Sequence, residues 1–202
     1  MKRAILIGVI FGGLLSATAT ATAQENAETA HVAVANPADL SHAEANAIYD
    51  KLQTKLDELY APAELELIKN YQSWKRYNSA PYISATHGQR FVNNFANEIG
   101  KDYGKLKIGE RYPVGTVLAK DSITVTDSGK NYPGAMFVME KLTPGTSPDT
   151  ADWRYVMVIP DGSIFGDTIG DEPELVEYCH VCHTGKASRD YVFYIPKAYR
   201  AE

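Results

Sequence analysis

The chain contains two cysteines, and both lie in one short stretch near its C-terminal end, Cys179-His180-Val181-Cys182-His183. Residues three and four positions apart share one face of a helix, so this spacing predicts a helical turn with both thiols on the same side. Two such thiols can add to the two vinyl groups of one porphyrin, and the adjacent His183 then lies under the iron. C-x-x-C-H is the attachment pattern of a c-type haem. We therefore expect one covalent haem c with its iron, held by Cys179 and Cys182 and ligated by His183.

Two other uses of paired cysteines fit this sequence less well. A redox-active C-x-x-C disulfide is expected within a thioredoxin-like βαβ pattern, which the sequence lacks. A structural zinc site draws its ligand pairs from two separated segments. Among the histidines outside the motif, His87 alone is placed where it could add a ligand to such a site. We interpret His180 as a solvent-facing residue of the haem-binding turn.

Residues 1–23 have the pattern of an export signal. A short positive head, Lys2-Arg3, precedes the apolar run Ala4–Leu15, and Ala21-Thr22-Ala23 fits an A-x-A cleavage site. The apolar run is too short to cross a bilayer about 30 Å thick as a helix. The alternative, an uncleaved membrane anchor, is disfavoured because no stop-transfer pattern follows.

Export and composition bound what the mature protein does. We expect the mature chain to begin at Gln24, with a flexible leader over 24–40 and one domain over 41–202. This domain would work outside the cytoplasm, most simply in a bacterial periplasm. The formal net charge of −5 and the absence of a basic run argue against nucleic acid or anionic lipid as a partner. An apolar content of 45% is typical of a globular domain and argues against several membrane spans.

Helical periodicity occurs early in the predicted domain and again at the motif. Ser41 with Glu44 three positions later is a capping box, and the apolar spacing behind it predicts a helix to about Tyr60. Pro62 suits the first turn of a second helix, predicted to run through about Tyr77. Two shorter helical segments are predicted over Asn97–Tyr103 and from Pro173 to His183.

The intervening sequence has the pattern of strands. Several runs are rich in β-branched and aromatic residues and are bounded by turn residues, which is typical of strands. In the first run, Arg90–Ala96, the side chains fall into two alternating sets as in a strand, but a helix fits this run almost as well. The predicted strands are Arg90–Ala96, Tyr112–Thr126, Ala135–Leu142, Trp153–Ile159 and Tyr191–Ile195. Helices followed by mostly consecutive strands predict an α+β fold with an antiparallel sheet.

The sixth ligand of the iron decides what such a haem does. An axial methionine well downstream of the motif is impossible, because neither Met nor His follows His183. Candidate ligands upstream are Met136, Met139, Met157 and His87, and the apolar run around Met136 favours a core strand instead. We therefore expect an open distal face. Access and polarity on that face decide between ligand binding, activation and electron transfer.

A haem motif close to the C-terminus, preceded by a strand-rich domain, resembles the cytochrome P460 family and its relatives, the β-sheet cytochromes c′. The resemblance covers roughly Tyr71 to Arg200. Gly115-Thr116-Val117-Leu118-Ala119-Lys120 is similar to a strand of the family with the pattern G-T-V-x-x-K. Asp152-Trp153-Arg154-Tyr155 and Asp190-Tyr191-Val192-Phe193 resemble the segments before and after the haem helix of the family.

This resemblance implies an antiparallel sheet with N-terminal helices, often in a homodimer, and chemistry on hydroxylamine or nitric oxide at a high-spin haem. In cytochrome P460 the strand lysine is linked covalently to the porphyrin, and Lys120 occupies the matching position. The β-sheet cytochromes c′ lack this link and mainly bind nitric oxide. Without the resemblance, Lys120 would be interpreted as a solvated strand residue beside Asp121.

Three further residues are candidates for the distal side. Arg90 lies where the family has an arginine and would donate hydrogen bonds to a nitrogen-oxide ligand, unless it forms a surface ion pair. Glu140 stands among apolar strand residues and is a candidate proton acceptor if it points inward. The alternative is that Glu140 faces water or pairs with Lys141. His87 could carry protons, although its neighbours Thr86 and Gly88 indicate a partly exposed loop.

The sequence thus favours a periplasmic monohaem cytochrome that oxidises hydroxylamine or nitric oxide and passes electrons to an acceptor cytochrome. Two alternatives stay open. One is a non-catalytic protein that binds nitric oxide, and the other is an electron carrier with an upstream sixth ligand.

Overall fold

The computed structural model describes residues 33–201, so the predicted export signal and the first part of the predicted leader lie outside the described residues. Its centre is an antiparallel sheet in the order β1-β3-β4-β6-β7-β8, with β2 paired to β3 and β5 paired to β4. The strands are β1 Lys75–Arg76, β2 Tyr82–Ser84, β3 Arg90–Ala96, β4 Val117–Val125, β5 Asn131–Pro133, β6 Met136–Lys141, β7 Trp153–Val158 and β8 Ile164–Asp167. The predicted α+β fold with an antiparallel sheet is confirmed.

Helix α2, His42–Tyr60, is the long helix of the described residues. Its capping box is formed as predicted: the Glu44 N–H donates to Ser41 Oγ at 3.3 Å, and the Ser41 N–H donates to the Glu44 carboxylate at 2.9 Å. One face of the helix is buried against the sheet through Ala45, Tyr49, Leu56 and Tyr60. The local capping signal and the apolar spacing together explain why this prediction was accurate.

The predicted second helix, Pro62 to Tyr77, is wrong. The chain forms three 3-10 turns, Ala61–Ala63, Glu66–Ile68 and Tyr71–Ser73, and then enters β1. Glu64 and Asn70 adopt positive φ angles of 49° and 60°, which a continuous helix cannot contain. The apolar residues Ile68 and Tyr71 still reach the core, each from its own turn.

The main strands lie close to their predictions. β3 has the predicted bounds, and β6 and β7 differ from theirs by one residue at an end or at both ends. β4 begins at Val117, five residues later than predicted, because the preceding chain turns at Gly115 with a φ of +84°. The short strands β2, β5 and β8 were not predicted.

The predicted strand Tyr191–Ile195 is also wrong, since this segment follows an irregular path. Asp190 and Tyr191 adopt left-handed φ angles of 50° and 65°, which no strand contains. The other segments of regular backbone are α3, Glu177–His183, and five 3-10 segments: Glu98–Gly100, Pro148–Thr150, Pro173–Leu175, Thr184–Arg189 and Lys197–Tyr199.

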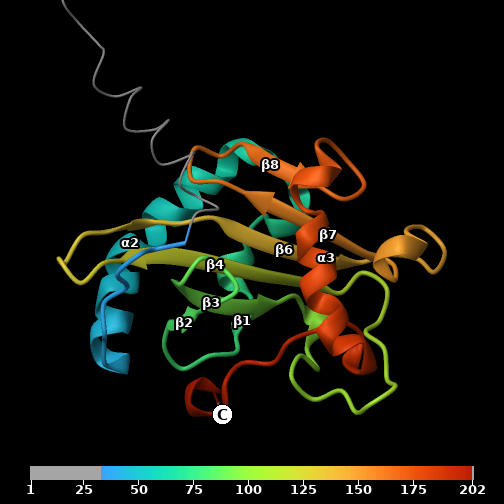
Figure 1. The fold of residues 1–202 in the computed structure, drawn as a ribbon, viewed down its shortest axis with the longest axis horizontal. Coiled ribbons are helices and arrows are strands. Elements are labelled where there is room, and N and C mark those ends of the chain that lie inside the picture. Colours follow the sequence, from blue (N-terminus) through green and yellow to red (C-terminus); the bar gives the residue numbers. More distant parts are fainter. Residues whose placement is uncertain (1–32, 202) are drawn as a thin grey trace, which may run out of the picture.

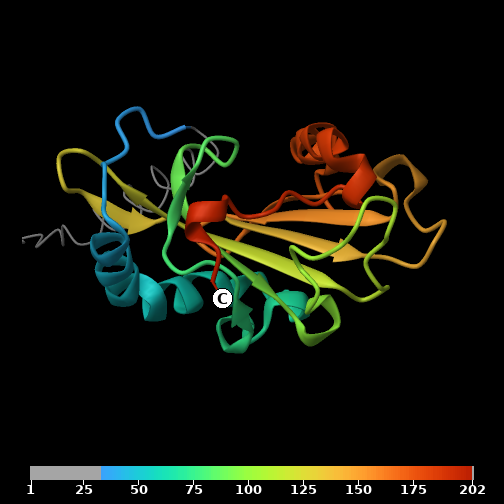
Figure 2. The same cartoon turned by 90° about the horizontal axis from the view of Figure 1, so that it is seen from below.

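Different elements cover the two faces of the sheet. Helix α2 and the turns after it pack on one face, and α3 crosses the other (Figure 1). Figure 2 shows the sheet nearly edge-on between them, with the loop between β2 and β3 on the same side as α3. No helix in residues 33–201 is long and apolar enough to cross a membrane. The sheet therefore separates two compartments, named below the α2 face and the α3 face.

Candidate functional site

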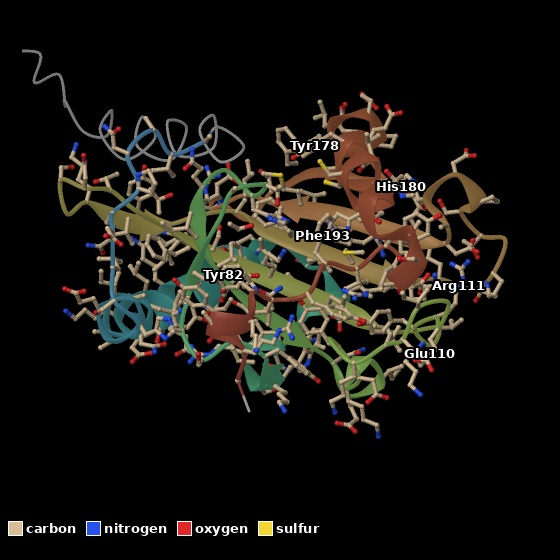
Figure 3. The ribbon with its side chains drawn as sticks, turned by 60° about the horizontal axis from the view of Figure 1, so that its bottom comes forward. Tyr82, Glu110, Arg111, Tyr178, His180 and Phe193 are labelled. Atoms are coloured by element: carbon tan, nitrogen blue, oxygen red, sulfur yellow. The ribbon has the colours of Figure 1, made fainter. Side chains whose placement is uncertain are left out.

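Helix α3 carries the cysteine motif across the α3 face. The predicted helix from Pro173 is interrupted at Val176, whose φ is −122°, so a 3-10 turn precedes the α-helix. Cys179 is half-buried and Cys182 is exposed, both as free thiols. Burial raises the pKa of the Cys179 thiol to about 11. Figure 3 shows this helix with Tyr178 and His180 labelled on it.

A cavity of about 600 Å³ lies between α3 and the sheet. Both cysteines and His183 line one wall, and strands β3, β4, β6 and β7 supply most of the opposite wall. Most lining residues are apolar or aromatic, among them Leu118, Phe137, Met139, Tyr155, Phe165 and Phe193. The volume and the lining are those of a site for a small molecule or a cofactor.

The imidazole of His183 is oriented by the segment that follows α3. Its Nδ1 lies 2.6 Å from the carbonyl oxygen of Tyr191. A carbonyl oxygen only accepts, so Nδ1 carries the proton and Nε2 keeps a free lone pair. Burial lowers the pKa of His183 to about 4, so the ring is neutral at pH 7. A neutral imidazole with Nδ1 bonded to a carbonyl is the usual arrangement of a metal-ligating histidine.

Lys120 reaches the cavity from the middle of β4. Side chains alternate between the faces of a strand, so Lys120 and Leu118 point to the α3 face, while Ala119 and Asp121 point to the α2 face. Burial lowers the pKa of Lys120 to about 8. About one tenth of this amine is therefore unprotonated at pH 7, far more than for a solvated lysine.

His87 also lines the cavity, and it is the partly exposed loop residue that the sequence predicted. Its Nε2 lies 3.4 Å from Lys120 Nζ, and its Nδ1 lies 2.8 Å from Ser84 Oγ. The loop turns back over the sheet because Gly88 and Gln89 adopt positive φ angles of 70° and 53°. Burial first, and the charge of Lys120 second, hold the pKa of His87 well below 6.5. His87 is therefore a neutral acceptor that faces the lysine.

Of the other two residues predicted for the distal side, Arg90 and Glu140, only Arg90 lines the cavity. Arg90 is buried at the start of β3 and lines the cavity, with Nη1 3.5 Å from the His87 carbonyl oxygen. Glu140 is not among the lining residues, and its carboxylate pairs with Arg154 Nη1 at 3.2 Å. Lys141, the predicted alternative partner of Glu140, instead pairs with Asp190. The geometry therefore removes Glu140 from the candidate site and keeps Arg90.

The family model for cytochrome P460 matches residues 68–194, well over half of the chain. The chain belongs to the cytochrome P460 family. The matched range contains the cysteine motif, Lys120, His87 and Arg90. A comparison with curated proteins gives no match. Membership of the cytochrome P460 family implies a haem cofactor with its iron.

The α3 face fits a haem in the chemistry of its residues. Two thiols and one neutral imidazole lie along a single wall of a largely apolar cavity. The hydroxyl of Tyr155 is buried beside this cavity and has no hydrogen-bond partner in residues 33–201. Its ring meets the His183 ring edge to face, with 5.4 Å between the centroids. A polar group left unpaired in a buried place indicates a missing partner, as expected where a cofactor belongs.

Glu174 was not predicted as a site residue, yet it is the one carboxylate among the described residues that line the cavity. It lies in the 3-10 turn just before α3, within the segment that was predicted as helix. No local signal identified it, because the chain changes from a 3-10 turn to an α-helix at Val176, between Glu174 and the lining residue Tyr178.

Of the three methionines considered as sixth ligands, two lie in the packed core and one lines the cavity. Met136 and Met157 are fully buried in the packed core around the sheet. Met139 is half-buried and lines the cavity, as His87 does. These two residues are thus the candidate sixth ligands, from the predicted set, that the fold places at the cavity.

Proposed function

We propose that this cytochrome P460 relative is exported to the periplasm and oxidises hydroxylamine at one haem c, passing electrons to an acceptor cytochrome. The observation that carries this proposal is the α3-face cavity, where Cys179, Cys182 and His183 lie opposite Lys120. The two thiols would anchor the cofactor through thioethers. When bound, the haem supplies an iron that holds the nitrogen of the substrate and takes up its electrons.

The proximal residues hold the cofactor in one orientation. His183 offers Nε2 to the iron because the Tyr191 carbonyl occupies its Nδ1–H. The rings of Tyr155 and Phe193 contact the imidazole edge to face at centroid distances of 5.4 and 5.2 Å, which restricts its rotation. Covalent attachment and a fixed imidazole together leave the opposite side of the cavity for substrate.

Proton removal is the task of the polar residues at the cavity. Oxidation of hydroxylamine by two electrons releases two protons, so a base close to the substrate accelerates the reaction. Glu174 and His87 both line the cavity, and the depressed pKa of His87 keeps its ring neutral and able to accept. Arg90 supplies permanent positive charge and hydrogen-bond donors for the oxygen of a nitrogen-oxide ligand.

Lys120 is proposed to form a third covalent tether to the cofactor, an N–C bond to the porphyrin edge that would replace one N–H and one C–H bond. This step would release two protons and pass two electrons to an external oxidant such as a peroxide. The resemblance to cytochrome P460 implies this link, and the lowered pKa of Lys120 favours the neutral amine that such a bond requires. A bond between a lysine and the porphyrin edge would perturb the electronic structure of the macrocycle. Protein changes to the macrocycle are one way in which a haem is tuned.

The test compares wild type with Lys120→Ala in absorption spectra and in hydroxylamine-dependent reduction of an acceptor cytochrome. Wild type is expected to show a red-shifted ferrous Soret band and to reduce the acceptor. Lys120→Ala is expected to keep its haem, to show an ordinary high-spin spectrum and to lose most of the oxidation. A digest should yield one haem-bearing product that contains both the Lys120 strand and the segment 179–183. Identical spectra for the two proteins, with no such product, would contradict the tether.

A second candidate, non-catalytic binding of nitric oxide, is favoured by the apolar lining of the cavity. Binding needs an open iron but no base, and Phe137, Phe165 and Phe193 give uncharged walls suited to a small apolar gas. One observation distinguishes the two candidates. A protein that only binds nitric oxide would not reduce the acceptor cytochrome when hydroxylamine is added, whereas an oxidase would. A low-spin ferric spectrum would instead indicate Met139 or His87 as a sixth ligand, and hence an electron carrier.

A further inference from the structure

Asp190 is a buried carboxylate that the proposed chemistry does not use. Its side chain is 0% exposed, yet it lies between two cations. Oδ1 accepts from Arg111 Nη1 and from Lys141 Nζ, both at 2.9 Å, and Oδ2 accepts from the Tyr112 N–H at 2.9 Å. Arg111, labelled in Figure 3, reaches it from the loop before β4. These contacts tie the chain after α3 to two distant segments.

The backbone at this point is held in an uncommon conformation. Asp190 and Tyr191 are consecutive left-handed residues, with φ angles of 50° and 65°. Asp tolerates this region, but a bulky residue such as Tyr does so rarely and needs support from its surroundings. The Tyr191 N–H donates to the Lys186 carbonyl at 2.9 Å, and the Tyr191 carbonyl faces His183 Nδ1 at 2.6 Å. The unusual turn is therefore what directs this carbonyl at the imidazole.

We propose that Asp190 is a positioning residue for the iron ligand: its bonds to Arg111 and Lys141 hold the left-handed turn whose carbonyl fixes His183. This inference rests on the proposed function, in which His183 ligates the haem iron. A hydrogen bond from Nδ1 to a well-placed acceptor makes Nε2 more basic and strengthens its bond to a metal. Asp190 would thus act on the iron through Tyr191 and His183, without touching substrate or cofactor.

Asp167 provides a matched control on the same protein. It is also a buried carboxylate, and it pairs with Arg154 Nη2 at 2.6 Å and accepts from the Ile169 N–H at 3.1 Å. It ends β8, and the hydrogen bonds of its carboxylate run to Arg154 and to the Ile169 N–H, not to the turn at Tyr191 or to His183. Loss of a buried, paired carboxylate destabilises a protein in either place, so stability alone does not distinguish the two residues.

The test is resonance Raman spectroscopy of the ferrous holoprotein, together with its reduction potential. The Asp190 carboxylate accepts three hydrogen bonds through two oxygens. In Asp190→Asn only one oxygen remains to accept, because the amide nitrogen is a donor. We expect the iron–histidine stretching frequency to fall and the reduction potential to become more positive. Asp167→Asn should lose thermal stability to a similar degree with both signals unchanged. Arg111→Ala, which removes a more exposed partner, should shift both signals slightly in the direction of Asp190→Asn.

The outcomes separate this inference from the function on which it rests. Wild-type frequency and potential in Asp190→Asn, despite reduced stability, would overturn the positioning role and leave the haem assignment intact. If Asp190→Asn fails to fold, unchanged signals in Arg111→Ala would overturn it equally. Absence of an iron–histidine band from wild type would instead refute His183 as the ligand, and the inference with it.

Discussion

The two faces of the sheet differ in how they treat their polar groups. On the α2 face, Asp121 is fully buried, and its carboxylate accepts from Tyr49 at 2.6 Å, from Tyr71 at 3.0 Å and from Asn93 at 3.2 Å. On the α3 face, the buried hydroxyl of Tyr155 has no partner among the described residues, and a cavity of about 600 Å³ stays open. The buried Asp121 on the α2 face thus has its hydrogen-bond partners within the chain, whereas the buried Tyr155 hydroxyl on the α3 face has none among the described residues.

Lys120 and Asp121 show the same contrast at adjacent positions of β4. The strand's period of two sends the lysine into the cavity and the aspartate into the packed core. Burial perturbs the pKa of both, lowering that of Lys120 to about 8 and raising that of Asp121 to about 6. A perturbed pKa is therefore not enough to identify a functional residue. Lys120 is the candidate because it lines the cavity, whereas Asp121 lies in the packed core.

The largest expected effect is on the α3 face. Replacing both cysteines, Cys179→Ala with Cys182→Ala, should remove all covalent haem, because no other cysteine is present to form a thioether. The α2 face has no part in attachment, so the far-ultraviolet circular dichroism should still report a folded sheet. Haem retained after denaturation of the double variant would show that attachment does not use these thiols.

The next effect separates catalysis from ligand binding within the cavity. Glu174→Gln should lower the rate of hydroxylamine oxidation by roughly 10²–10⁴-fold, the usual contribution of a general base. Affinity for nitric oxide should be unchanged, since binding releases no proton. Glu177→Gln is the matched control, because Glu177 is exposed as Glu174 is but does not line the cavity. Equal losses in the two variants would remove Glu174 from the mechanism.

A third prediction places a defect on the α2 face alone. Leu56 is 0% exposed at the centre of that core, and Leu56→Ala should lower the free energy of unfolding by about 2–5 kcal/mol. The haem spectrum of the folded variant should match wild type. Chemical denaturation followed by circular dichroism measures the first quantity and absorption the second. A changed spectrum would mean that the two faces are not independent.

The smallest effect is a pH dependence assigned to Asp121. Its pKa is raised from 3.8 to about 6, mainly by burial, so the folded state favours the protonated carboxyl. The stability from this group is complete below pH 3.8 and is lost as the pH rises through 6, by about 3 kcal/mol at most. Asp121→Asn should lack this dependence. A constant difference in unfolding free energy between the two proteins from pH 4 to 7 would contradict the assignment.

Local signals predicted the parts of the fold that local forces determine. The capping box and apolar spacing located α2, and the turn residues bounded β6 and β7 to within a residue. The second helix was mispredicted because positive φ angles at Glu64 and Asn70, neither of them a glycine, leave no mark in the sequence. The predicted last strand failed for a related reason, since the Tyr191 carbonyl bonds to a side chain on α3.

For the site residues too, local sequence signals predicted some positions, and the tertiary fold determined the others. The cysteine motif and Lys120 were found from spacing and resemblance, and both line the cavity. The sequence left two positions open for Glu140, because alternation along β6 does not by itself say which set of side chains faces inward; the structure pairs it with Arg154. His87 and Glu174 lie on a loop and a 3-10 turn, and only the tertiary fold brings such segments together over the sheet.

The central claim is that the α3 face holds one covalent haem, and the intact mass of the purified protein tests it most directly. Expression in a strain with haem maturation should give the mass of the mature chain plus one haem, resistant to acid and acetone. The mass of the mature chain alone, with two free thiols or one disulfide at Cys179 and Cys182, would contradict the account.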